Sequence, residues 1–226
     1  MNRVGDCMRR RKKPGAMEKL LSHKNYVHEK PETFKGEWSS FFQNDNPIHV
    51  ELGTGRGQFI TKLAECNPDM NYVGVEIKEE ILLKAVEKAH EKDLKNIIFL
   101  WFDINRIEEI FAKEEVDRIY INFCDPWPKK RWAKRRLTHR GFLDKYIHLL
   151  KPRGEIQFKT DNERLFEFSL NEFALRDFFL RNITLDLHHS DYDLNVTTEY
   201  EDKFSSMNMK IYRCEAVKKI DNLVNL

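Results

Sequence analysis

The chain has 226 residues, of which 41% are hydrophobic and 34% are charged. This length fits one large α/β domain with or without an arm, and the apolar fraction is sufficient for a hydrophobic core. No apolar run reaches the ~18 residues of a membrane span, and the basic N-terminus lacks the apolar segment of a signal peptide. The four cysteines are scattered and form no Cys-x-x-Cys pair, so we expect reduced thiols, a cytoplasmic protein and no metal site.

Positive charge gathers in two short stretches of the sequence. The formal net charge is only +2, but Arg9–Lys13 contributes five cations and Lys129–Arg140 contributes seven, with no acid in either stretch. Without those twelve cations the rest of the chain carries −10. A basic zone on an acidic body is typical of a nucleic-acid-binding protein. Two unrelated solubilising patches are the alternative explanation of this feature.

The predicted elements divide the chain into a basic N-terminal arm, residues 1–47, and a single domain, residues 48–226. The arm holds a short helical piece and a segment rich in aromatic residues. From Pro47 onward strands and helices alternate, which predicts a mainly parallel sheet with helices on both faces. Strands are predicted at His49–Leu52, Tyr72–Ile77, Asn96–Phe102, Val116–Cys124, Glu155–Lys159, Phe178–His188 and Met209–Lys218. Helices are predicted up to Cys66 and over Lys78–Lys92, Thr138–Leu150 and Glu163–Phe173, with Thr138 as a helix cap and Pro152–Gly154 as a turn.

A glycine-rich loop follows the first predicted strand, with the sequence ELGTGRG from Glu51 to Gly57. Glycines let the backbone turn sharply and approach a ligand closely. The dinucleotide pattern G-x-G-x-x-G would need a small residue at position 58, where this chain has Gln58, so a nicotinamide dehydrogenase is disfavoured.

Each of the first four predicted strands ends in an acid. Because the carboxyl ends of parallel strands line one crevice, we expect these acids to lie along the same edge. Four carboxylates would repel a pyrophosphate but suit a ligand with an ammonium and a sulfonium, S-adenosylmethionine. For any single acid, a role as a helix cap or as a solvated loop residue is as good an explanation as ligand binding. That structural explanation weakens when all four acids fall in register at strand ends. The acids are Glu51, Glu76, Asp103 and Asp125.

The stretch Asp125–Arg140 reads DPWPKKRWAKRRLTHR and joins the fourth acid to the second basic cluster. An acid at a strand end, directly before dense positive charge, indicates chemistry on a nucleic acid, with the cations holding phosphates. A solvated basic helix explains the cations but not the Asp-Pro-Trp-Pro before them. An amino-methyltransferase of DNA or protein is a rival, but its Asp/Asn-Pro-Pro-aromatic motif has proline where this chain has Trp127.

Six motifs occur in a fixed order: VELGTGRGQF, VGVEI, FDI, DPWPKKR-x3-KRRLT, KTDN and T-x-Y-E. In these the chain, from about Met8 to its C-terminus, resembles the bacterial tRNA (guanine-N7)-methyltransferases of the TrmB family. The resemblance implies a class I, Rossmann-like S-adenosylmethionine-dependent methyltransferase fold: a seven-stranded, mostly parallel sheet with an antiparallel last strand and helices on both faces. It also implies methyl transfer to N7 of a variable-loop guanosine in tRNA. One departure is Cys124, where the family is expected to have serine, and a thiol at this place is open to oxidation.

The resemblance assigns roles to individual residues. Asp125 resembles the catalytic residue. The implied cofactor-binding residues are Glu51, Gly53, Gly55, Glu76, Asp103 and Asp125. The implied tRNA or guanine site comprises Lys129, Asp161, Thr198, Glu199, Tyr200 and Glu201. The cations expected to hold the tRNA backbone are Lys130, Arg131, Lys134, Arg135 and Arg136. The expected partner is tRNA, with no membrane or metal, and the protein is expected to be a monomer or homodimer.

The chemistry of this reaction can also be argued from the substrate. Guanine N7 is a lone-pair acceptor that carries no proton at neutral pH, so it needs no general base. A fixed carboxylate such as Asp125 or Asp161 would stabilise the positive charge that develops on the purine, and in-line positioning supplies much of the remaining acceleration. Two further alternatives remain: a non-catalytic RNA-binding protein that retained the fold, and a methyltransferase acting on another nucleic acid.

Overall fold

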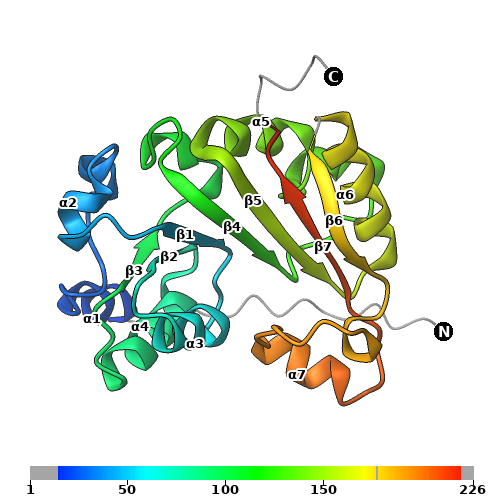
Figure 1. Ribbon diagram of the computed structural model, residues 1–226. Coiled ribbons are helices and arrows are strands. Elements are labelled where there is room, and N and C mark those ends of the chain that lie inside the picture. Colours follow the sequence, from blue (N-terminus) through cyan, green and yellow to red (C-terminus); the bar gives the residue numbers. More distant parts are fainter. Residues whose placement is uncertain (1–14, 177, 220–226) are drawn as a thin grey trace.

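The computed structural model describes residues 15–176 and 178–219, which form a single seven-stranded sheet in the order β3-β2-β1-β4-β5-β7-β6 (Figure 1). Strands β1 to β5 pair in parallel, and β7 pairs antiparallel with both β5 and β6. This arrangement confirms the predicted sheet with its antiparallel last strand. The strands are β1 (Ile48–Leu52), β2 (Asn71–Glu76), β3 (Ile97–Trp101), β4 (Val116–Asn122), β5 (Leu150–Thr160), β6 (Phe179–Thr184) and β7 (Tyr212–Val217).

Helices connect most of the strands. Seven α-helices lie in the described residues: α1 (Ala16–Ser22), α2 (Trp38–Phe42), α3 (Gln58–Cys66), α4 (Glu79–Glu91), α5 (Arg140–Leu149), α6 (Glu163–Leu175) and α7 (Glu199–Ser205). Four short 3-10 helices are η1 (Pro31–Phe34), η2 (Ile104–Glu109), η3 (Lys130–Arg135) and η4 (Leu187–His189). Because parallel strands need long crossovers, most of these helices lie against the sheet faces.

The two faces of the sheet differ in chemistry. Alternate residues such as Val50, Ile119 and Phe158 form one apolar core, which includes Tyr146 of α5 and Phe173 of α6. The strand period of two sends the intervening residues to the opposite face. Both sets are buried, so each face of the sheet needs its own covering layer.

The opposite face is apolar on one half and polar on the other. Over β2 and β3, Tyr72 and Phe99 pack with residues of α3 and α4 such as Ile60 and Leu82. Over β4, β5 and β7 the residues that alternate with the apolar core are charged or polar instead. These residues are Arg118, Asn122, Glu155, Gln157, Lys159, Arg213 and Glu215.

The described part of the N-terminal arm is fixed to the edge of the sheet at β3. The carbonyl of Tyr26 accepts the amide of Phe99 at 2.7 Å, and Val27 forms a parallel bridge with Phe99. Trp38 is fully buried, and its indole donates to the carbonyl of Ile110 at 2.8 Å. The basic stretch at residues 9–13 lies outside the described residues, and the domain boundary at residue 47 stays a prediction.

The start of α5 differs from the prediction. The N-cap is His139, whose Nδ1 accepts the amide of Gly141 at 3.1 Å, and not Thr138. Thr138 is fully buried, and its hydroxyl accepts a hydrogen bond from Ser169 of α6 at 2.7 Å. The hydroxyl therefore serves the contact between the two helices, a tertiary demand that local sequence does not reveal.

Two late strands also have other limits than predicted. The turn expected at Pro152–Gly154 is an irregularity inside β5, where the pairing with β4 passes from Leu150 to Glu155. The strand expected to run to His188 ends at Thr184, and Leu187 is buried as part of η4. An apolar residue looks the same in sequence whether a strand or a short helix buries it.

Gly57 closes the glycine loop against α4, and we predict that it tolerates no side chain. Its φ is 77°, and a Cβ placed there would lie 2.5 Å from the Cβ of Ala85. Overpacking and a left-handed backbone together should make Gly57→Ala destabilising by about 3 kcal/mol. Gly55→Ala is the control: its φ is 57° but the nearest atom is 4.0 Å away, so only the backbone term of about 1 kcal/mol applies. Urea unfolding measures both, and equal losses would contradict the packing argument.

Candidate active site

A crevice at the carboxyl edge of the sheet brings together segments that are far apart in the sequence. The helix α7 lies beyond the carboxyl ends of β4 and β5 (Figure 1, orange). Its N-terminal end meets the glycine loop and the end of β4. The crevice is lined by Glu51, Gly53, Thr54, Gly55, Arg56, Gln58, Phe59, Asn122, Phe123, Thr198, Glu199 and Tyr200. The glycine loop and the first three residues of the T-x-Y-E motif therefore line one site.

Glu51 is the buried acid of this crevice, with 2% of its surface exposed. Its carboxylate accepts hydrogen bonds from the hydroxyl of Thr54 at 2.6 Å and the amide of Asn122 at 2.8 Å. Burial raises the pKa of Glu51 to about 7, although both hydrogen bonds and the charge of Lys159 favour the ionised form. A carboxyl with this pKa is only partly ionised at neutral pH, and a cationic ligand would draw it fully into the charged form.

The glycine loop leaves open space beside this acid. Gly53 has a φ of 78°, and a Cβ built on it would meet no atom within 4 Å. The amide of Gly55 donates to Glu76 at 3.3 Å, and Glu76 also accepts the amides of Ile77 and Lys78 at 3.0 Å each. A bare backbone beside open space, next to a buried acid, fits a ligand that carries positive charge and lies close to the loop.

The two remaining acids occupy different surroundings at the same edge of the sheet. Asp103 caps η2 and accepts two hydrogen bonds from Asn105, at 2.9 and 2.8 Å. Asp125 is exposed, in the segment between β4 and η3. It lies between Phe123 and Trp127, whose φ angles of 50° and 42° are in the left-handed region. Such strained backbone is concentrated at functional sites, where the surrounding structure holds it in place.

The loop that carries Asp125 is held from inside by Arg136. The guanidinium donates to the carbonyls of Pro126 at 3.0 Å and Trp127 at 3.1 Å, and lies 4.3 Å from the ring centroid of Phe168. Arg136 is one of the five cations expected to hold the tRNA backbone, but these N–H groups donate to carbonyls of the protein itself. A cation in a basic stretch can therefore stabilise the conformation of a loop.

The other cations of the basic cluster are arranged around two tryptophans. The rings of Trp127 and Trp132 meet edge to face at 5.8 Å. Lys129 lies 4.9 Å from the centroid of Trp132, and Arg135 lies 4.9 Å from that of Trp127. The segment forms the short 3-10 helix η3, and its cations are exposed, which is also compatible with a solvated basic helix.

A second opening lies beside the same loop and contains Asp161. Its volume is about 430 Å³. Asp161 follows β5 directly and shares this opening with Pro126 and Pro128, the two prolines after Asp125. The remaining lining residues are Arg136, Asn162, Glu163, Arg164 and Leu165.

The helix α7 is tied to α3 and α4 across the crevice. Gln58 donates to Asp202 at 2.6 Å, and Lys88 pairs with Glu199. Tyr200 is 44% exposed, and its ring lies 5.0 Å from that of Phe123. Two aromatic rings from separate elements therefore form one wall of the crevice.

Two further residues of α7 play structural parts in its first turn. Thr198 caps the helix by accepting the amide of Glu201 at 2.9 Å. Glu201 is fully buried and pairs with Lys159 of β5 at 2.6 Å. Lys159 belongs to the KTDN motif but was assigned no role from the sequence. A lysine inside an otherwise buried strand was the signal that could have found it.

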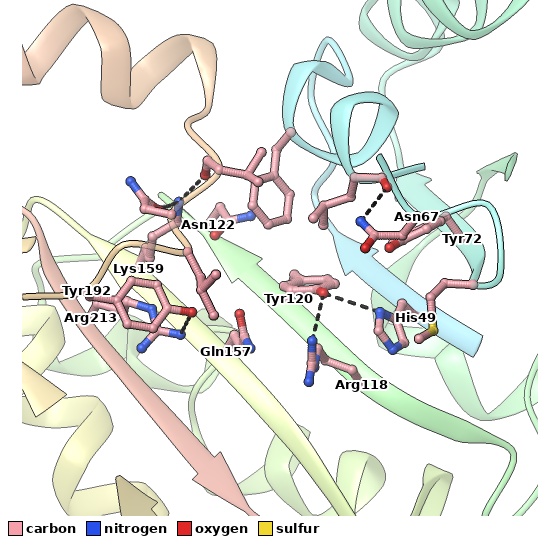
Figure 2. Close-up of a pocket in the computed structure, with 16 residues that line it drawn as sticks. His49, Asn67, Tyr72, Arg118, Tyr120, Asn122, Gln157, Lys159, Tyr192 and Arg213 are labelled. Atoms are coloured by element: carbon pink, nitrogen blue, oxygen red, sulfur yellow. Dashed lines mark hydrogen bonds between the residues drawn. The ribbon is translucent and has the colours of Figure 1, made fainter. Parts of the chain in front are cut away.

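A cavity of about 290 Å³ adjoins the crevice on the polar half of the sheet face (Figure 2). It shares Phe59 and Asn122 with the crevice. Inside it the hydroxyl of Tyr120 lies 3.2 Å from His49 and 3.3 Å from Arg118. Burial lowers the pKa of His49 to about 4, so the ring is neutral at physiological pH.

Cys124, the departure from the family pattern, lies directly before Asp125. Burial raises the pKa of its thiol to about 12, and the charge of Asp125 adds to the shift. Cys66, Cys124 and Cys214 are free thiols. Within residues 15–176 and 178–219 we find no group of three or more metal-binding side chains, and no helix there is long and apolar enough to cross a membrane.

The sheet order and the glycine loop after β1 define a class I methyltransferase fold, and solved structures agree. The 16S rRNA methyltransferase KamB is 13% identical with a TM-score of 0.64, and an antibiotic-related methyltransferase is 19% identical with a TM-score of 0.58. Each match covers 82% of this chain and 94% of the other chain. At these identities the likeness shows the fold, which confirms the fold class predicted from the motifs.

Sequence comparisons identify the family. The model of a putative methyltransferase family matches residues 45–214. A tRNA (guanine-N(7)-)-methyltransferase of Clostridioides difficile (strain 630) is 62% identical over 94% of this chain and 100% of its own length. A protein of the same name from Geobacillus sp. (strain WCH70) is 49% identical over 92% of this chain and 94% of its own. The chain belongs to the tRNA (guanine-N(7)-)-methyltransferase family, and its methyl donor is S-adenosylmethionine.

We predict that neutralising Glu51 stabilises the protein at high pH. Below its unfolded pKa of about 4.5 the carboxyl is protonated in both states. Between that value and the folded pKa of about 7 the unfolded state ionises while the buried carboxyl keeps its proton, so the folded state loses stability until the loss levels off above the folded pKa. The stability of Glu51→Gln relative to wild type should therefore rise between pH 5 and 8, by up to about 3 kcal/mol.

Urea unfolding at several pH values measures this difference. The control is Glu167→Gln, which removes an exposed carboxylate from α6 and should give a flat profile. A flat profile for Glu51→Gln as well would show that Glu51 is not a buried acid with a raised pKa.

Proposed function

We propose that the protein transfers the methyl group of S-adenosylmethionine to N7 of a guanosine in tRNA, and that this guanosine lies in the variable loop. One observation carries the proposal: the glycine loop with its buried acid and the first three residues of the T-x-Y-E motif, Thr198–Tyr200, line a single crevice. The activity in the names of the relatives supports it, since they are similar to this chain over nearly their whole length. The exposed cations of η3 follow the end of β4 and offer a surface for phosphates.

The cofactor fits the acids at this edge of the sheet. Glu51 would pair with its ammonium group, and Glu76 with the ribose diol. Gly53 and Gly55 would let it lie against the loop, with Asp103 and Asp125 completing the set. When bound, it supplies an electrophilic methyl group on a sulfonium.

Asp125 is proposed to orient the guanine and to stabilise the positive charge that appears on the purine. Guanine N7 carries no proton at neutral pH, so Asp125 has no proton to remove. A carboxylate that is already in place lowers the barrier because it does not have to reorganise during the transfer. Asp161, in the opening beside the same loop, would bind the base edge together with Asp125.

The proposed tRNA contacts divide into two groups. Lys130, Arg131, Lys134 and Arg135 would hold phosphates, whereas Arg136 would act by bracing the loop of Asp125. Lys129, Thr198, Glu199 and Tyr200 would face the guanosine. Stacking on the aromatic wall formed by Phe123 and Tyr200 suits a base that has left the tRNA stack, because every base presents a π-face.

The direct test is methyl transfer from labelled S-adenosylmethionine to unmodified tRNA, followed by nucleoside analysis. The expected product is 7-methylguanosine in the variable loop. Label on adenosine, cytidine or protein would overturn the proposal. Binding of tRNA without any transfer would instead favour the non-catalytic RNA-binding alternative.

We predict that Asp125→Ala lowers single-turnover methyl transfer by roughly 10²–10³-fold, the usual effect of losing one preorganised electrostatic contact. Folding should be preserved because Asp125 is exposed and lies outside the strands. Asp144→Ala is the control: it removes an aspartate from α5 that pairs with Arg176 at the surface, and it should leave the rate unchanged. A near-wild-type rate for Asp125→Ala would remove Asp125 from the mechanism.

A further inference from the structure

Lys159 is a buried cation on the polar half of the sheet face, with 5% of its side chain exposed. All three of its ammonium protons have acceptors. It donates to Glu201 at 2.6 Å, to the carbonyl of Val196 at 2.9 Å and to the side chain of Asn195 at 3.2 Å. All three acceptors belong to the segment of residues 187–201, which we call the strap. Figure 2 shows Lys159 pointing from the sheet toward the strap.

Glu201 is the matching anion, and its side chain is completely buried. One carboxylate oxygen accepts from Lys159, and the other accepts from Asn195 at 2.6 Å. The second oxygen also lies 3.3 Å from Nε2 of His188. Every partner of this carboxylate lies in the protein, so Glu201 has no free face to offer a substrate.

The neighbours of Glu201 in sequence are placed differently. Thr198, Glu199 and Tyr200 line the crevice, while Glu201 does not. Because residues one or two apart in a helix do not share a face, the carboxylate of Glu201 can point toward the sheet while Glu199 and Tyr200 reach the crevice. The hydrogen bond from the amide of Glu201 to the hydroxyl of Thr198 caps this turn.

A second cation fastens the other part of the strap. Arg213 of β7 donates to the hydroxyl of Tyr192 at 2.8 Å, and its guanidinium lies 3.7 Å from the centre of that ring (Figure 2). The strap crosses the cavity of about 290 Å³ between these two attachment points. Charged contacts therefore hold the strap on the sheet at two points, in addition to the apolar packing of Leu187 and Val196.

We propose that Lys159 and Glu201 form a buried clamp that sets the position of Thr198–Tyr200 over the crevice, which makes Lys159 a positioning residue for methyl transfer. This inference rests on the proposed function only for its effect on the rate. It assigns Glu201 a role within the protein in place of the direct guanosine contact expected from the sequence. Lys159 also lies on the same sheet face as Glu51, and its charge favours ionisation of that acid. Lys159 thus favours the charged form of Glu51 and also pairs with Glu201 of the strap.

Two variants distinguish a clamp between Lys159 and Glu201 from a direct contact of Glu201 with the substrate. Lys159→Met keeps the length of the side chain but leaves the carboxylate of Glu201 buried without its cation, which is strongly unfavourable. Lys159→Met combined with Glu201→Met replaces the ion pair by an apolar pair of similar volume, a change that is often neutral or stabilising. The control is Lys218→Met, which removes a lysine that donates to the carbonyl of Leu150 at 2.7 Å, away from the strap.

The first readout is hydrogen exchange of the amides of residues 195–202, which needs no activity. In Lys159→Met we expect exchange at least about tenfold faster than in wild type, because the strap opens locally. The second is kcat/KM for tRNA, which should fall about 100-fold when the contact residues are misplaced. The double variant should restore slow exchange and most of the rate, and Lys218→Met should match wild type in both.

Two results would overturn the clamp. One is unchanged exchange in Lys159→Met. The other is a double variant with restored exchange that stays as inactive as the single variant, which would show that Glu201 acts on the substrate itself. If Lys159→Met does not fold, Lys159→Arg replaces it, and a clamp predicts a smaller increase in exchange and a smaller loss of rate. Absence of methyl transfer in the wild-type protein would contradict the proposed function, while the exchange measurement would still test the clamp.

Discussion

The parallel pairing of β1 with β4 is the constraint on which the candidate site depends. It places Glu51 opposite Tyr120, so that Asn122 can donate to the buried carboxylate. The pairing of β4 with β5 in turn places Asn122 opposite Lys159. Hydrogen-bonded register thus fixes an acid, an amide and a cation in a row across three strands. A slip of β4 by one residue would send Asn122 to the apolar face and break this row.

The sheet face that carries this row has two parts with different packing. Over β2 and β3 the face is apolar and supports the domain, whereas over β4, β5 and β7 it carries buried ions that hold the strap. Buried ion pairs contribute little net stability compared with apolar packing, but they specify one arrangement. Glu51 likewise lowers the stability of the fold in favour of the site, because burial disfavours the negative charge that would bind a cationic ligand. The crevice is therefore less stable than an apolar edge would be.

Much of the fold could be predicted from the sequence because strand–helix alternation and the glycine loop are local signals. The mainly parallel sheet was predicted from these signals and the acids were expected at one edge, whereas the antiparallel last strand and the methyltransferase family were implied by the resemblance of the six motifs. The wrong helix cap has a tertiary cause, because Thr138 bonds to Ser169 instead. At Thr138 the residue type was compatible with a cap and with this contact, and only a partner distant in sequence decided between them. The tRNA-binding roles of Arg136 and Glu201 stay predictions, and the structure adds that Arg136 donates into a loop and that Glu201 pairs with Lys159.

The thiol of Cys124 has a consequence for how the enzyme withstands oxidants. The thiolate is the form that peroxides and alkylating reagents attack, and a pKa of about 12 leaves almost none of it at neutral pH. Burial therefore lowers the reactivity expected of the thiol beside Asp125 at neutral pH. Cys66, which is exposed at the end of α3, is better placed to take up a reagent. Covalent labels can thus be attached to α3 while the segment that carries Asp125 stays unmodified.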